Sequence, residues 1–243
     1  MDFTASESTQ KQNLGERYKA KISFVSPHTN RNNFEQEPQC FLGVSLENRN
    51  FTPNRFDAML EWASRRFEKC LILVGDHIHR ITLQSTRSMP EAMASQEALR
   101  LGRVFMQESQ PTLDAHCHCT DFQFITCLEI QKSKEWLNIY TLLNEYFLQN
   151  SHFRESVEKF GRNYHRHNWH SLTDEQRKLR LDFSCQYFLE EFAVFAYLLK
   201  RGVKTMVYPG AFSTLSEIAN GLYPNVPGEL QKLTVVSLQL KRR

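Results

Sequence analysis

Residues 40–45 read Cys40-Phe41-Leu42-Gly43-Val44-Ser45, and a polar stretch, residues 46–50, follows them. A few apolar residues that give way abruptly to a polar segment are typical of a parallel strand buried on both faces. In open α/β sheets, ligands bind just beyond the carboxyl ends of such strands. This stretch therefore predicts a central strand of an α/β sheet, with the hydroxyl of Ser45 at the edge where ligands bind.

Gly43 lies two residues before Ser45 and so faces the same side of the predicted strand. Because it has no side chain, it leaves room beside the serine hydroxyl. A purely structural role stays open, in which Ser45 caps or turns the chain and Gly43 only packs. The full hydrolase elbow, Gly-x-Ser-x-Gly, is absent because position 47 is Glu47.

The composition indicates a globular domain of ordinary size. Of the 243 residues, 41% are apolar and 23% charged, and no apolar run approaches the ~20 residues of a membrane span. Residues 1–17 are polar and lack the apolar core of a signal peptide. We therefore expect a disordered leader at 1–17, one domain over 18–243, a cytoplasmic monomer and no membrane partner. The net charge of +3 permits an anionic partner without requiring one.

Hydrophobic periodicity predicts strands that alternate with helices along the chain. Strands are expected at residues 18–25, 41–45, 71–74, 122–130, 204–208 and 233–240. Helices are expected at residues 54–69, 90–110, 136–150, 152–160, 174–201 and 214–221. This order predicts one Rossmann-like α/β domain, with a mostly parallel central sheet flanked by helices.

The predicted helix 174–201 carries Tyr187 and Glu191 four residues apart, and therefore on one face. Its neighbours are mostly apolar, and a glutamate is costly to bury there without a cationic partner. Glu191 is thus a candidate to hold an ammonium group or to move a proton. A solvated position for Glu191, or for its neighbour Glu190, stays open. Tyr208 ends a predicted strand and should reach the sheet edge that carries Ser45, unless it only packs on a turn.

Other motifs favour neither a metal nor a nucleotide cofactor. The run His116-Cys117-His118-Cys119 would place its two histidines on one side if it were extended, but no Cys-x-x-Cys pair with zinc spacing accompanies it. Residues 164–170 contain three histidines and are expected to form an exposed helix end and loop. The chain has no phosphate-binding loop and no Gly-x-Gly-x-x-Gly after a strand.

Basic residues fall into two candidate surfaces for RNA phosphates, which mainly require positive charge. The first set, on or near helix 90–110, is Arg87, Arg100 and Arg103. The second set, at the start of helix 174–201, is Arg177, Lys178 and Arg180. Residues 241–243 add a basic tail. Each of these residues also fits an ordinary solvated surface.

Three features in register resemble the tRNA-dependent cyclodipeptide synthases. They are the strand 41–45 ending in Ser45, the pair Tyr187 and Glu191, and Tyr208 followed by proline. The Tyr-Pro pair resembles the branch of that family with proline, not glutamine, after this tyrosine. The chain departs from the family at Gln39, where a histidine is usual, and at Ala193, where proline is favoured.

The resemblance implies a fold like the catalytic domain of class I aminoacyl-tRNA synthetases, with aminoacyl-tRNAs as substrates and no ATP or other cofactor. Ser45 would attack one aminoacyl ester, a second aminoacyl-tRNA would yield a dipeptidyl enzyme, and ring closure would release a diketopiperazine. Glu191 would bind the ammonium group of the first residue and relay a proton. Tyr187 would hold the same amino group, and Tyr208 would order the pocket mouth or assist proton transfer.

Side chains around Ser45 are expected to select the substrate. Phe41 and Leu73, on neighbouring predicted strands, are the candidates for contact with the first amino acid, and Gly43 leaves room beside it. Asn48, three residues after Ser45, matches an asparagine more typical of the other branch of the family. The six basic residues named above would contact the tRNA.

Two other functions stay open on the sequence. A serine esterase or another acyltransferase would need a histidine base, and His77 and His79 follow the predicted strand 71–74. A non-catalytic RNA-binding domain with a Rossmann-like core would keep the fold without a reactive serine.

Overall fold

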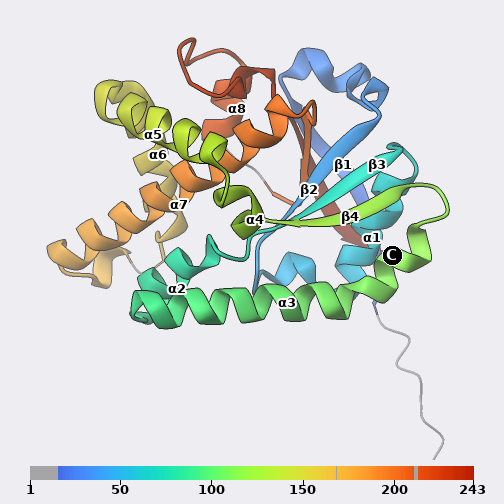
Figure 1. Ribbon diagram of the computed structural model, residues 1–243, viewed down its shortest axis with the longest axis horizontal. Coiled ribbons are helices and arrows are strands. Elements are labelled where there is room, and N and C mark those ends of the chain that lie inside the picture. Colours follow the sequence, from blue (N-terminus) through green and yellow to red (C-terminus); the bar gives the residue numbers. More distant parts are fainter. Residues whose placement is uncertain (1–15, 168, 211–212) are drawn as a thin grey trace, which may run out of the picture.

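The computed structural model describes residues 16–167, 169–210 and 213–243, and six strands within these ranges form one sheet (Figure 1). The strands are β1 (Tyr18–Ser26), β2 (Gln39–Val44), β3 (Lys69–Val74), β4 (Asp121–Thr126), β5 (Thr205–Tyr208) and β6 (Thr234–Arg242). Their order is β1-β6-β5-β2-β3-β4, with β1 antiparallel to β6 and the other neighbours parallel. The predicted mostly parallel sheet is confirmed. The predicted leader falls, except for Glu16 and Arg17, outside the described residues.

Helices cover both faces of the sheet (Figure 1). They are α1 (Pro53–Ser64), α2 (His79–Arg87), α3 (Glu91–His116), α4 (Cys127–Gln131), α5 (Lys134–Gln149), α6 (Ser151–Tyr164), α7 (Asp174–Lys200) and α8 (Ser213–Ala219). Short 3-10 turns lie in the connections as η1 (His28–Asn32), η2 (Phe34–Gln36), η3 (Arg49–Phe51), η4 (Trp169–Ser171) and η5 (Leu230–Lys232). In the part of the chain that the structure describes, no helix is both long and apolar enough to cross a membrane.

Strand β2 is buried on both faces, as its apolar run predicts. Cys40, Leu42 and Val44 pack with α1 on one side of the sheet. Phe41 packs with α7 on the other side. Since side chains alternate along a strand, Ser45 projects toward the α7 side, as Phe41 and Gly43 do.

The connections of β2 create the place where a ligand can enter. From β2 the chain continues through β3 to β4 on one side, and it then returns to β5 on the other side of β2. Strand order therefore reverses between β2 and β5, where open α/β sheets hold ligands. Leu42 pairs with Val207 in this ladder, so Ser45 and Tyr208 end adjacent strands at the same edge.

The predicted strand 122–130 is wrong beyond Thr126, where α4 begins. The Thr126 hydroxyl accepts a hydrogen bond from the Glu129 amide at 3.1 Å, and the Glu129 carboxylate accepts one from the Thr126 amide at 2.9 Å. This reciprocal cap starts a helix, and Cys127 and Ile130 then bury one helical face. A short apolar run does not by itself distinguish a strand from a buried helical turn.

Three other helices differ from the sequence prediction. Helix α2 was not predicted, and it buries Ile81 and Leu83 before Ser88 ends it at a φ of 51°. Helix α3 continues beyond the predicted end at residue 110, through Pro111, because Leu113 is buried against the core. The predicted helix 54–69 ends earlier, since residue 69 already begins β3.

Candidate active site

A pocket of about 550 Å³ opens at the carboxyl edge of the sheet. Ser45, Tyr187, Glu191 and Tyr208 all line it. These residues come from the end of β2, from α7 and from the end of β5. The structure therefore brings together the residues that the sequence analysis selected at separate points of the chain.

The hydroxyl of Ser45 lies 2.9 Å from the hydroxyl of Tyr208. Asn48 makes a second contact with Tyr208, because its side-chain NH₂ group donates to the Tyr208 hydroxyl at 3.4 Å. The side-chain oxygen of Asn48 accepts a hydrogen bond from the backbone amide of Asn50 at 2.9 Å and so caps η3. Burial raises the pKa of Tyr208 to about 12, against the opposing effect of its bond with Ser45. Tyr208 is thus a neutral phenol at physiological pH, fixed next to the serine oxygen.

Glu191 lies on the same pocket with an incompletely bonded carboxyl group. Tyr187 donates to Glu191 Oε1 at 3.4 Å, whereas Oε2 is shielded from solvent and has no hydrogen-bond partner among the described residues. Burial raises the pKa of Glu191 to about 8, and the bond from Tyr187 lowers it. A buried carboxyl without a cationic partner can accept a proton or hold an ammonium group that enters the pocket.

The neighbouring carboxylate, Glu190, is buried differently. It is 3% exposed and receives two bonds from Arg80, at 2.9 and 2.7 Å, and another from Gln131 at 2.9 Å. Neither glutamate lies on the solvated edge that the sequence left open. The ion pair satisfies Glu190, while Glu191 remains available for a ligand.

A second cavity, of about 10 Å³, lies beside Ser45 and Glu191. Gly43 and Leu73, two of the candidates for the surroundings of the first amino acid, line it. A side-chain carbon on Gly43 would lie 3.4 Å from a ring carbon of Tyr208, so the glycine does leave space there. Phe41 lines neither cavity. It is fully buried against Phe195, with ring centroids 5.3 Å apart, because it lies deeper in the strand.

No histidine serves Ser45 as a base among the described residues. His79 lines the large pocket, but its Nε2 lies 3.0 Å from a carboxylate oxygen of Glu47. Burial lowers the pKa of His79. His77 is bonded to Gln131 at 2.7 Å. This geometry does not support an esterase that uses either histidine.

The sequence analysis missed part of the pocket. His79, Thr82, Ser85 and Thr86 of α2 line it, and of these four only His79 was named from the sequence, as a candidate base. The recognisable signal of α2 was the spacing of these polar residues, which lie three and four apart and therefore share one helical face. The segment 164–170 was expected to be exposed, yet Tyr164 and His165 also line the pocket. His165 is buried through a 3.0 Å contact with the Ser184 hydroxyl.

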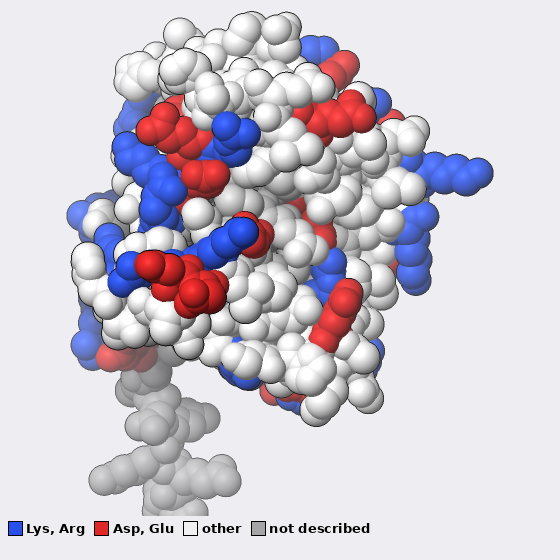
Figure 2. Space-filling model, turned by 90° about the vertical axis from the view of Figure 1, so that its left-hand side faces the viewer, with Lys and Arg blue, Asp and Glu red and all other residues white. Residues whose placement is uncertain are grey.

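The six basic residues proposed to form two RNA-binding surfaces differ in their ionic partners. Three are ion-paired: Arg87 with Glu47, Arg100 with Glu97, and Arg177 with Asp174. Three form no ion pair with described residues: Arg103, Lys178 and Arg180. Figure 2 shows basic and acidic side chains interspersed on the side where α5, α6 and α7 lie. Arg87 belongs to α2 and the second set belongs to α7, and both helices also carry residues that line the pocket.

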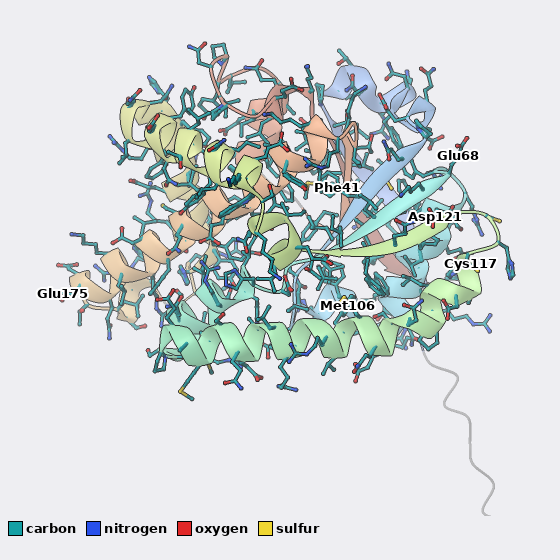
Figure 3. All side chains as sticks on the ribbon, viewed as in Figure 1. Phe41, Glu68, Met106, Cys117, Asp121 and Glu175 are labelled. Carbon is teal, nitrogen blue, oxygen red and sulfur yellow. The ribbon has the colours of Figure 1, made fainter. Side chains whose placement is uncertain are left out.

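The His116–Cys119 run is not the extended segment that a metal site on it would need. His116 is the last residue of α3, and Cys117 caps that helix with a bond to the Asp114 carbonyl. His116 is bonded to Asp57 at 2.8 Å. Figure 3 shows Cys117 on the opposite side of the molecule from Glu175 at the start of α7. Within the described residues, no group of three or more possible ligands could hold a metal ion.

The sheet order and the pocket at its switch point define a Rossmann-like α/β protein. A Mycobacterium tuberculosis protein, described as demonstrating that cyclodipeptide synthetases are related to type I tRNA synthetases, shares this fold. It is 12% identical, with a TM-score of 0.62 over 99% of this chain and 100% of that chain. The family model for cyclodipeptide synthases matches residues 25–224. The chain therefore belongs to the cyclodipeptide synthase family.

Other solved structures agree in fold. A cyclodipeptide synthase from Fluoribacter dumoffii is 18% identical, with a TM-score of 0.78 over 94% of this chain and 100% of that chain. One from Candidatus Glomeribacter gigasporarum, bound to Phe-tRNAPhe, is 17% identical, with a TM-score of 0.61 over 88% and 92% of the two chains. No curated protein sequence matches this chain significantly.

Proposed function

We propose that this protein joins two aminoacyl groups, delivered as aminoacyl-tRNAs, into a cyclic dipeptide through esters formed on Ser45. The observation that carries the proposal is the convergence of Ser45, Tyr208 and the unpaired carboxyl of Glu191 on one pocket. Family membership supports the reaction class, and the solved relative bound to Phe-tRNAPhe supports the donor. The Tyr208-Pro209 pair favours the branch of the family with proline after this tyrosine.

In the first step, the Ser45 oxygen bonds to the carbonyl carbon of an aminoacyl ester, and the bond from that carbon to the ribose oxygen breaks. The proton of the serine hydroxyl passes to the departing ribose oxygen, and Tyr208, 2.9 Å from Ser45, can carry it. An ester is already an activated acyl donor, so the serine needs no histidine base of the kind used against amides. The ammonium group of the bound residue faces Glu191.

Glu191 loses its proton to solvent when the ammonium group binds beside it, because an opposite charge stabilises the carboxylate. In the second step, the ammonium group gives a proton to this carboxylate and the resulting amine attacks a second aminoacyl ester. The raised pKa of Glu191 suits this transfer, because a general base acts best when its pKa lies near the pH at which it works. The peptide bond forms as the second ribose hydroxyl leaves. The amine of the second residue then attacks the ester on Ser45, closes the ring and returns the serine hydroxyl.

The other side chains of the site have supporting roles in this proposal. Tyr187 orients the carboxyl of Glu191, and Asn48 holds Tyr208 against the serine. Gly43 and Leu73 border the first aminoacyl group. Aromatic residues of the pocket wall exclude water that would hydrolyse the enzyme ester: Phe160, Phe183 and Phe188. A cytoplasmic monomer remains our expectation.

The test is mass spectrometry of extracts from bacteria that express the chain or its Ser45→Ala variant. Cyclic dipeptides should appear only with the unmodified protein, and their masses identify both amino acids. A matched control is Ser184→Ala, since Ser184 lines the same pocket but its hydroxyl bonds to the Arg180 carbonyl and to His165. Product from a folded Ser45→Ala variant would refute the serine ester.

A further inference from the structure

Helix α2 presents a row of polar side chains to the pocket. His79, Thr82, Ser85 and Thr86 all line it, at the three- and four-residue spacing that shares one helical face. The helix leads away from the sheet edge (Figure 1). The row therefore begins near the loop after Ser45, where His79 meets Glu47, and extends outward. The chemistry proposed at Ser45 uses none of these four side chains.

Two hydroxyls in this row have no hydrogen-bond partner within the described part of the chain. Ser85 Oγ is shielded from solvent and makes no hydrogen bond with any described residue, and Thr82 Oγ1 makes none either. Leaving a buried hydroxyl unsatisfied costs about 1–3 kcal/mol. Ser85 lines the pocket, so a rotation about its side-chain bond would turn this hydroxyl toward a ligand there. A ligand with polar groups at this wall would supply the missing partners.

The pocket also has an aromatic wall and is roomy. Phe160 and Tyr164 of α6 and Phe183 and Phe188 of α7 line it, and Tyr164 is 60% exposed at the surface. A volume of about 550 Å³ is that of a site for a drug-sized ligand, larger than one aminoacyl group requires. The pocket can therefore hold a second component beside the aminoacyl group, one with an aromatic face and polar edges.

A cation lies at the end of the polar row. Arg87 is the last residue of α2, and it donates to both carboxylate oxygens of Glu47 at 2.7 Å. The arginine side chain is 47% exposed, so an incoming phosphate can compete for it. The order along α2 is then a histidine near the serine loop, hydroxyls in the middle and a guanidinium at the outer end.

We propose that this face of α2 binds the terminal nucleoside of the aminoacyl donor, with its hydroxyls on the ribose and the base edge. The proposal rests on the proposed function, because the aminoacyl group is esterified to that ribose. Once the ester carbon reaches Ser45, the ribose must lie in the same pocket. Threonine and serine hydroxyls both donate and accept, as ribose hydroxyls do, and aromatic rings stack on bases.

The experiment compares two acyl donors on the same enzyme. Acylation of Ser45 is followed by intact-protein mass spectrometry, with a purified aminoacyl-tRNA and with a dinitrobenzyl ester of the same amino acid, which carries no nucleoside. In Thr82→Val and Ser85→Ala, kcat/KM for the aminoacyl-tRNA relative to that for the ester should fall by about 2- to 10-fold, the effect of one lost hydrogen bond. Thr141→Val on α5 is the matched control, since its hydroxyl bonds the Leu137 carbonyl outside the pocket.

Two outcomes would overturn the proposal. An equal loss of kcat/KM with both donors would mean that the α2 face contacts the amino acid, and an unchanged kcat/KM with both donors in both variants would mean that it contacts neither component. If the unmodified protein is acylated by neither donor, the serine ester itself is refuted and the proposal fails with it. A fall in the ratio that Thr141→Val does not share would support the nucleoside site.

Discussion

Replacing Glu191 by glutamine should make the protein more stable at neutral pH while it abolishes product formation. Burial raises the pKa of Glu191 from its ordinary value of 4.5 to about 8, so the folded protein keeps a proton that the unfolded chain releases between these values. Stability of the wild type therefore falls as pH rises through this window, relative to a variant that does not titrate. Glutamine retains the shape and removes the titration.

The expected size follows from the shift. The difference in unfolding free energy grows by about 1.36 kcal/mol for each pH unit above 4.5. The variant Glu191→Gln should therefore be more stable than the wild type by about 3 kcal/mol at pH 7 and by about 5 kcal/mol at about pH 8. Below pH 4.5 the two proteins should unfold with similar free energies, since both side chains are then neutral. The assay is urea denaturation of both proteins at several pH values, with the difference in unfolding free energy plotted against pH.

The adjacent glutamate supplies the control. Glu190→Gln removes the carboxylate that pairs with the buried Arg80, so it should destabilise the protein by about 3–5 kcal/mol. Two neighbouring, chemically identical changes should thus shift stability in opposite directions at neutral pH. A difference for Glu191→Gln that is flat or falls with pH would refute the reasoning, because it would show that the folded state does not disfavour the charge.

Three further results are expected. Tyr208→Phe should keep the fold within about 0.5–1.5 kcal/mol, the value of one hydrogen bond, yet slow acylation of Ser45 in the mass assay; an unchanged rate would exclude the phenol from proton transfer. Gly102→Ala should lower the unfolding free energy by about 1–3 kcal/mol in urea titrations, because its new carbon would lie 2.6 Å from Asp76 Cβ; equal stability would show that α3 moves freely. Arg80→Met should lower the melting temperature measured by calorimetry, because it leaves the buried carboxylate of Glu190 without its cation. Adding Glu190→Met to this variant should restore the melting temperature, because no unpaired charge then remains.

Much of the fold follows from local pattern. The apolar run 40–44 has buried side chains on both faces, and the structure indeed places it at the centre of the sheet. The cap formed by Thr173 with Gln176 marks the start of α7 as predicted. The secondary-structure prediction failed after Thr126, where the local sequence pattern is compatible with two structures. The apolar residues after Thr126 suit a strand or a helical turn equally, and a side chain that bonds the backbone decides for the helix.

For the candidate site, the sequence by itself determined which side chains could react. It placed Ser45 directly after a buried strand and put Tyr187 and Glu191 on one helical face, because burial and periodicity are encoded by near neighbours. Only the tertiary structure decided which glutamate carries a partner. Arg80 lies 110 residues from Glu190 in the chain, and it reaches that carboxylate only because α2 packs on α7. The same packing forms the polar wall of the pocket and leaves Glu191 without a cation, since contacts between distant segments depend on how complete helices fit together.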